Sequence, residues 1–226
     1  MGDSPFQLDF DDLPRVLPLF PLSGVLMLPR GELPLNVFEP RYLNMVLDSL
    51  GEERMVGILQ PARSAADPIA DDARLLSTGC AGRITAFQET SDRRLLVTLT
   101  GVCRFRLGQE VDSGGGYRRA VVDYSDYKAD MIDDGRVQAV DRQSLLRALK
   151  TYGAARSMQV EWNSLDGVDD EVLVHQLAMG LPFAPNDKQA LLEAPDLIER
   201  GRILTALLDM AALQGDDESD DAGTRH

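Results

Sequence analysis

The stretch VLPLFPLSGVLMLPRGELPLNVFEPRYLNMVLDSLGEERMVGILQP, residues 16–61, decides which fold the chain is expected to adopt. Its apolar residues arrive in short bursts that are separated by Pro18, Pro21, Pro29 and Pro34. Proline has no amide donor and a fixed φ, so these bursts favour edge strands and bends over helices. The segment 54–60, RMVGILQ, is typical of a buried strand and ends at Pro61. Most of the stretch is therefore expected to be β-structure.

One helix is expected to interrupt this β-rich stretch. It begins at Glu39-Pro40, because the missing N–H of Pro40 is harmless at the first helical position. The apolar residues follow the helical spacing i, i+3, i+4 and i+7, at Leu43, Val46, Leu47 and Leu50. Gly51 is expected to end the helix in a left-handed conformation.

Further strands are predicted over residues 75–90, 94–107 and 118–124 from apolar runs and alternating apolar residues. Gly79 and Gly82 indicate bulges or close strand approach. The glycine run 114–116 lies between two of these strands and lacks the Gly-Lys-Ser/Thr ending of a phosphate-binding loop, so it predicts a hairpin loop. Strands joined by turns predict a small barrel or closed sheet.

The pattern becomes helical from about residue 130. Helices are predicted over residues 137–152, 166–180 and 186–192, with a last one from Pro195. The expected organisation is a flexible acidic arm (1–13), a β-rich subdomain (14–128), a helical subdomain (129–213) and a disordered acidic tail (214–226). The predicted fold class is α+β.

Two parts of the chain resemble a known family. The segments LPLFPLSGVLMLPRGELPLNVFEPRYLNMV and MVGILQP are similar to the opening of the Lon substrate-binding (amino-terminal) domain family. The segment MGLPFAPNDKQALLEAPDLIERGRILTALLDM resembles the helical half of that domain. Together these regions cover most of residues 15–213. The resemblance implies a PUA-like β-barrel with one inserted helix, followed by a C-terminal helical bundle.

Neither the ATP-binding loop nor the Ser-Lys peptidase pair of Lon protease is found in the sequence. The histidines, His175 in a predicted helix and His226 in the tail, are too few for a hydrolase triad or a metal site. Paired acids such as Asp71-Asp72 and Asp169-Asp170 are expected on the solvated surface. We therefore expect no catalytic residues, no metal, no cofactor and no enzymatic activity.

The composition indicates which classes of partner and which cellular compartment to expect. The formal net charge is −14, from 37 acidic and 23 basic residues, which argues against nucleic acid as a partner because phosphate binding needs a basic footprint. Cys80 and Cys103 are too few for a disulfide framework and are expected to be small apolar residues of strands. No signal peptide and no membrane-spanning stretch is recognised, so a cytoplasmic protein is expected.

The resemblance implies a non-catalytic module, adaptor-like or for substrate recognition, that binds unfolded or extended polypeptide segments. The candidate peptide-binding residues are Leu35, Phe38, Glu39, Arg41 and Tyr42, which are expected to border a groove. A structural alternative is that Glu39 caps the helix and Arg41 pairs locally. Met27, Met45 and Met55 suit either an adaptable binding surface or the core. A protease or chaperone is a further candidate partner, and a homodimer is left open.

Two alternatives remain open from the sequence. Some PUA-like proteins bind RNA, and Arg104, Arg106, Arg118 and Arg119 would support this if they shared one strand face. The other alternative is a barrel that holds a small ligand, with chemistry that the sequence motifs do not reveal.

Overall fold

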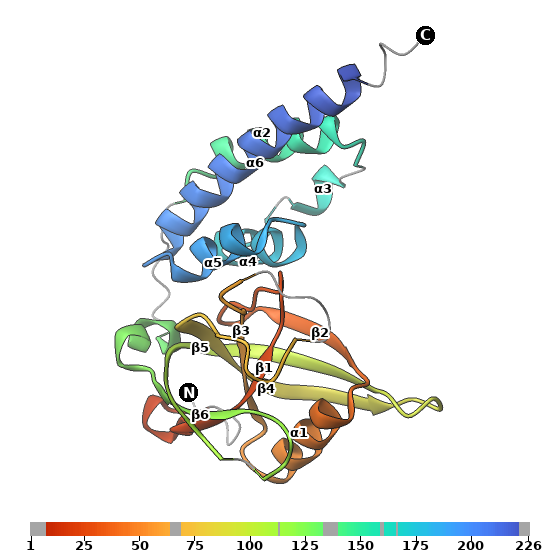
Figure 1. The fold of residues 1–226 in the computed structure, drawn as a ribbon. Helices are drawn as coiled ribbons and strands as arrows, with labels where there is room; N and C mark the ends of the chain where they lie inside the picture. The colour runs from red at the N-terminus through yellow and green to blue at the C-terminus, as the bar shows by residue number, and fades with distance from the viewer. Residues whose placement is uncertain are drawn as a thin grey trace. The chain divides into compact units, whose positions relative to one another are not determined.

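The structure, a computed structural model, describes residues 8–63, 69–112, 114–132, 140–158, 161–165 and 167–221. The chain divides into two compact units, Met1–Gly135 and Arg136–His226 (Figure 1). The described residues contain one six-stranded sheet and the helices α1 to α6. The first unit extends beyond the predicted β-rich subdomain of residues 14–128, because the 3-10 helix η2 (Ser125–Met131) belongs to it.

The sheet of the first unit closes on itself. Its strands are β1 (Val16–Pro21), β2 (Glu32–Val37), β3 (Met55–Leu59), β4 (Thr78–Glu89), β5 (Leu95–Val111) and β6 (Arg119–Asp123). Their order is β2-β5-β4-β3-β1-β6, and β6 also pairs with β5. The strands β5, β4, β3, β1 and β6 thus form a ring of pairings, to which β2 is added at the outer side of β5. The strand pair β1–β3 is parallel and the other pairs are antiparallel.

Helix α1 (Pro40–Gly51) has the predicted bounds but buries a different face. The predicted inward residues included Leu47, whose side chain is 55% exposed. The buried residues also follow helical spacing, one position earlier, at Tyr42, Met45, Val46 and Ser49. Tyr42 stacks on Phe20 of β1, with ring centroids 4.3 Å apart, and this aromatic contact accompanies the rotated face.

The end of α1 also differs from the prediction. Gly51 is the last helical residue and does not adopt a left-handed conformation. The left-handed residue is instead Arg54, with φ 59°, and its N–H donates to the carbonyl of Ser49 over 2.9 Å. The helix therefore ends through a wider turn that leads directly into β3.

Phe105 of β5 lies at the centre of the core of the first unit and is fully buried. Gly79 of β4 makes room for its ring, because a Cβ at this position would lie 2.5 Å from Phe105 Cζ and 2.7 Å from the carbonyl oxygen of Ile58. The pairing of β4 with β5 shifts register between Ala81 and Gly82. The predicted close approach and bulge at Gly79 and Gly82 are therefore confirmed.

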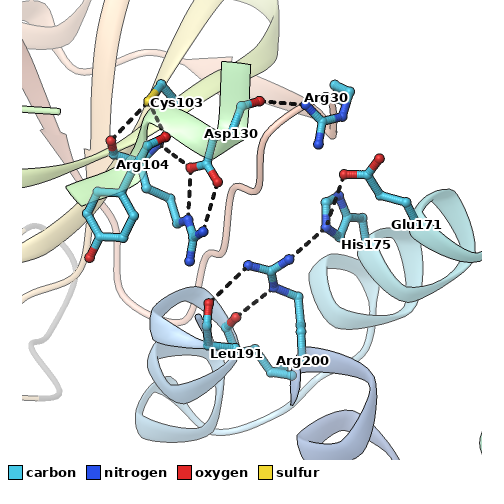
Figure 2. Close-up of polar contacts among 10 residues, drawn as sticks. Arg30, Cys103, Arg104, Asp130, Glu171, His175, Leu191 and Arg200 are labelled. Atoms are coloured by element: carbon cyan, nitrogen blue, oxygen red, sulfur yellow. Dashed lines mark hydrogen bonds and ion pairs between the residues drawn. The ribbon is translucent and has the colours of Figure 1, made fainter. Parts of the chain in front are cut away.

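The core of the first unit also holds a buried ion pair. Arg104 of β5 and Asp130 of η2 are both buried, with Nη2 and Oδ1 2.8 Å apart (Figure 2). The carbonyl oxygen of Asp130 accepts a hydrogen bond from Arg30 Nη1 over 2.6 Å. η2 is thus fastened to β5 and to the loop that precedes β2.

Part of the predicted N-terminal arm lies among the described residues. Phe10 to Asp12 form the 3-10 helix η1. Leu8 and Phe10 pack against the core, and the Phe10 ring meets Tyr124 edge-on at 6.5 Å. Residues 1–7 lie outside the described residues.

The second unit is helical among its described residues. Its helices are α2 (Arg142–Ala155), α3 (Trp162–Leu165), α4 (Asp170–Gly180), α5 (Pro185–Glu193) and α6 (Leu197–Asp221). Buried leucines of four helices form its core, among them Leu145, Leu173, Leu191 and Leu204. Helix α6 continues past Gly215, into the segment for which composition predicts disorder, and the predicted tail after Asp221 lies outside the described residues.

A second buried polar group joins helices within this unit. Arg200 of α6 donates from Nη1 to Nε2 of His175 on α4 over 3.0 Å, and from Nε to the Leu191 carbonyl of α5 over 2.9 Å (Figure 2). His175, predicted to be an ordinary packed or solvated residue, is a buried hydrogen-bond acceptor.

Candidate functional site

A groove of about 450 Å³ lies on the outer part of the sheet, where β2, β5 and β4 run side by side. The register places Asn36, Leu96 and Gln88 in one row across the three strands. Pro34, Thr98 and Ala86 form the next row on the same face, because side chains two residues apart in a strand share a face. All six residues line the groove.

Leu96 lies in the middle of the first row and its side chain is 45% exposed. Asn36 and Gln88, whose amide groups both donate and accept hydrogen bonds, flank it on the neighbouring strands. An exposed apolar side chain between two amides offers contacts to an apolar side chain and to peptide groups. This combination suits an extended polypeptide.

The remaining lining residues, Leu35, Val97 and Phe87, form the row between these two, so their side chains point to the opposite face of the sheet. Phe87 is 53% exposed, whereas Val97 is buried. None of the nine lining residues has an ionisable side chain. The groove therefore offers binding contacts without a general acid, a general base or a charged nucleophile.

Two of the five residues predicted to bind peptide belong to this region. Leu35 lines the groove and is half-buried. Phe38 directly follows β2, is 54% exposed, and lies 5.6 Å below the guanidinium of Arg94. Phe38 adds an exposed aromatic ring next to the end of β2.

The other three predicted residues form a structural cluster at the start of α1. Arg41 donates from Nε to Glu39 Oε2 over 3.0 Å, from Nη1 to the carboxylate of Asp71, and from Nη2 to the Ile69 carbonyl over 2.8 Å. Its guanidinium also lies 4.6 Å from the ring centroid of Tyr42. Arg41 thus ties the start of α1 to the segment around residue 70.

Glu39 and Tyr42 are held within the same cluster. Glu39 occupies the N-cap position of α1, but its side chain makes no capping hydrogen bond and accepts from Arg41 instead. Tyr42 is buried, and this burial raises the pKa of its hydroxyl. The alternative that Arg41 pairs locally agrees with these contacts, whereas side-chain capping by Glu39 does not.

The three methionines considered for an adaptable binding surface are buried. Met27, Met45 and Met55 are at most 3% exposed and belong to the core. The exposed apolar residues around the groove are instead Leu96 and Phe87, on opposite faces of the sheet, and the sequence analysis did not single out either of them. The run Leu95-Leu96-Val97 is apolar at three successive positions, so it carries no alternation that would mark Leu96 as exposed.

The arginines considered for RNA binding all meet carboxylates. Arg104 is buried against Asp130, and Arg106 lies 3.3 Å from Asp126. Arg118 pairs with Glu110, which holds the pKa of that carboxyl below its usual range, and Arg119 lies 3.3 Å from Glu52. Since Arg104 is buried and the others are neutralised locally, these residues do not form a continuous basic surface.

Among the residues that the structure describes, no group of three or more His, Cys, Asp or Glu side chains is arranged to hold a metal ion. In the same part of the chain, every helix is too short or too polar to cross a bilayer.

Comparison with known proteins gives consistent matches. The family model of the "ATP-dependent protease La (LON) substrate-binding domain" matches residues 16–210. Lon protease 2 of Myxococcus xanthus is 26% identical over 211 residues, which cover 90% of this chain and 24% of the relative. Lon protease 2 of Sorangium cellulosum is 28% identical over 206 residues, covering 85% and 24%. The chain thus spans about a quarter of the length of these relatives.

Solved structures show the same fold. The crystal structure of a Lon N-terminal domain protein from Xanthomonas campestris has a TM-score of 0.56 and 24% identity, covering 84% of this chain and 97% of that one. The N-terminal domain of the Mycobacterium avium complex Lon protease has a TM-score of 0.58 and 17% identity, covering 85% and 97%.

Proposed function

This chain belongs to the LON substrate-binding domain family, and we propose that it is a polypeptide-binding module without catalysis of its own. The match covers residues 16–210 and concerns the substrate-binding domain, not the ATPase or protease parts of the relatives. The observation that carries the proposal is the groove of β2, β5 and β4, which combines an exposed leucine with two amides and has no ionisable lining residue.

Binding would be the reversible burial of an apolar side chain of an unfolded polypeptide against Leu96. Asn36 and Gln88 would exchange hydrogen bonds with its peptide groups, so that the desolvated backbone keeps its partners. Phe38 would add an exposed aromatic ring at the end of β2, while Leu35 lines the groove from the inward-facing row. We assign Glu39, Arg41 and Tyr42 to holding the start of α1 in place.

The RNA alternative finds less support, because its four arginines pair with carboxylates and the chain has a net charge of −14.

We further propose that the first unit is a PUA-like barrel and that the protein works in the cytoplasm. There it would hold unfolded segments for a separate protease or chaperone, as an adaptor does.

Fluorescence anisotropy of a labelled, permanently unfolded polypeptide tests the binding step. We expect saturable binding by the full chain, and a loss of affinity of at least about tenfold for Leu96→Ser, equivalent to about 1.4 kcal/mol. Leu47→Ser is the matched control, because Leu47 is an exposed leucine of the same unit outside the groove, at 55% against 45% for Leu96. Circular dichroism establishes that both variants are folded.

Absence of polypeptide binding up to about 1 mM would sink the proposal. Equal affinity losses in both leucine variants would remove the groove as the binding site. Degradation of an unfolded substrate by a separate Lon protease, with and without this protein, tests the adaptor role. Light scattering shows whether the protein is a monomer or a homodimer.

A further inference from the structure

A second cavity of the first unit is chemically unlike the groove. Its volume is about 520 Å³, and Arg30, Arg54 and Arg83 line it. We propose that this cavity binds a small organic anion that carries a phosphate group. The inference does not rest on the proposed function, because the two sites have no lining residue in common.

The charge of the lining favours an anion. Three guanidinium groups accompany one carboxylate, that of Asp130. This carboxylate accepts three hydrogen bonds from Arg104, one of them from the backbone N–H, so the guanidinium of Arg104 balances its charge. In a chain with 37 acidic and 23 basic residues, three arginines around one hollow create a local positive field. Guanidinium groups match the oxygens of phosphate through paired N–H donors.

The backbone at two of the arginines is unusual. Arg30 has φ 63° and Arg54 has φ 59°, a left-handed conformation that residues other than glycine rarely adopt. Such conformations persist where the surrounding structure fixes them, and they concentrate at binding sites. Here both arginines begin a segment that enters the sheet, Arg30 before β2 and Arg54 before β3.

Hydrogen bonds hold both arginines at the cavity. The N–H of Arg30 donates to the Gly101 carbonyl over 2.7 Å, and its Nη1 donates to the Asp130 carbonyl over 2.6 Å. The Arg54 carbonyl accepts from the N–H of Ile84 over 2.8 Å. The backbone positions of the two arginines are therefore set before any ligand arrives, which lowers the entropic cost of binding.

The rest of the lining supplies hydroxyl and apolar contacts. The Oγ1 atoms of Thr85 and Thr100 lie 3.0 Å apart, and both residues line the cavity. Leu8, Val102 and Met131 add apolar side chains. Hydroxyls and guanidiniums suit the phosphate, while the apolar residues suit an attached organic group. The volume lies within the range of sites for small molecules, about 300–1,000 Å³.

Isothermal titration calorimetry of the full chain with phenyl phosphate tests the proposal. Two control ligands accompany it. Inorganic phosphate lacks the organic group, and benzyl alcohol lacks the charge. We expect saturable binding of phenyl phosphate, weaker binding of inorganic phosphate, and no binding of benzyl alcohol. Added sodium chloride should weaken the binding of phenyl phosphate, because salt screens the arginines.

Arg54→Gln and Arg83→Gln are each expected to lower the affinity for phenyl phosphate at least about tenfold, since each substitution removes a charged hydrogen-bond donor. Arg15→Gln is the matched control, because Arg15 is an exposed arginine of the same unit outside the cavity. Arg54 is itself exposed, so its variant is expected to fold even if the Arg83 variant does not. Absence of binding up to about 10 mM, or equal binding by Arg54→Gln and the native chain, would overturn the site. If inorganic phosphate bound as tightly as phenyl phosphate, the inference that the ligand carries an organic group would be wrong.

Discussion

Arg104 donates three hydrogen bonds to the carboxylate of Asp130, from its backbone N–H over 3.0 Å, from Nε over 2.9 Å and from Nη2 over 2.8 Å. Both side chains are more than 90% buried. The carboxylate therefore replaces the water that the guanidinium loses, and it also satisfies a backbone donor of β5. A pair of this kind is costly to break, because removal of one partner leaves the other charge buried.

Asp130→Ala is expected to lower the free energy of unfolding by about 3–5 kcal/mol, as measured by urea denaturation. Asp126→Ala removes the exposed partner of Arg106 and should cost less than about 1 kcal/mol. Similar small losses in the two variants would show that water reaches Arg104 and compensates for the missing carboxylate.

Gly101→Ala is expected to destabilise the first unit, because the added Cβ would lie 2.0 Å from the Leu28 carbonyl oxygen. Relief requires the backbone before β2 to shift, at a cost of about 1–3 kcal/mol or more. The control is Gly51→Ala, where no atom lies within 4 Å of the new Cβ. Thermal unfolding should show a lower Tm for the first variant only. An unchanged Tm for Gly101→Ala would mean that this segment moves without cost.

His175→Ala is expected to destabilise the second unit by about 1–3 kcal/mol, because Arg200 loses a buried acceptor. A guanidinium can only donate, so Nε2 of His175 is the acceptor of this hydrogen bond. Val172→Ala on the same helix is the control, since Val172 is exposed, and it should change stability by less than about 0.5 kcal/mol. Chemical denaturation measures both changes. Equal effects would show that the contact with Arg200 contributes nothing beyond helix packing.

Burial raises the pKa of the Cys103 thiol from 9.0 to about 12, and it also raises the pKa of Cys80. Because the folded-state pKa is the higher one, the unfolded chain releases these protons first. Stability is therefore fully present below pH 9 and falls as the pH rises from about 9 to about 12. The limiting slope is about 1.4 kcal/mol per pH unit for each thiol.

Urea titrations at a series of pH values measure this slope, and Cys103→Ala should reduce it. The native protein should also resist alkylation by iodoacetamide at pH 8, since neither buried thiol is ionised there. Rapid labelling of the native state would contradict the expected burial.

Much of the fold follows from local patterns in the sequence. The predicted strands over 54–60, 75–90, 94–107 and 118–124 correspond to β3, β4, β5 and β6, and the long helices start and end near proline, aspartate or glycine. These features depend on backbone preferences that neighbouring residues already determine. The sequence resemblance to the Lon domain family is confirmed by the family match.

Tertiary contacts decided what local patterns could not. In α1, both the predicted set of apolar residues and the buried set that begins at Tyr42 have helical spacing. The buried set is the one that contains Tyr42, whose ring stacks on Phe20. Arg104 was one of the four arginines considered for a shared basic strand face, but it is buried against Asp130 of η2. Leu96 is exposed because its side chain points to the face of the sheet opposite to that of its buried neighbours Leu95 and Val97, and the core covers only the latter face. Each outcome depends on a segment distant in sequence.

Pro34 lies in the middle of β2, the terminal strand of the sheet order. A sheet edge normally invites a further strand to add to it, and in that way unfolded chains start to aggregate. A strand that approached β2 would find no N–H at Pro34 and would lose one hydrogen bond of the new ladder. If unfolded chains bind in the neighbouring groove as proposed, this interrupted edge would keep β2 from acting as a template on which those chains assemble into polymers.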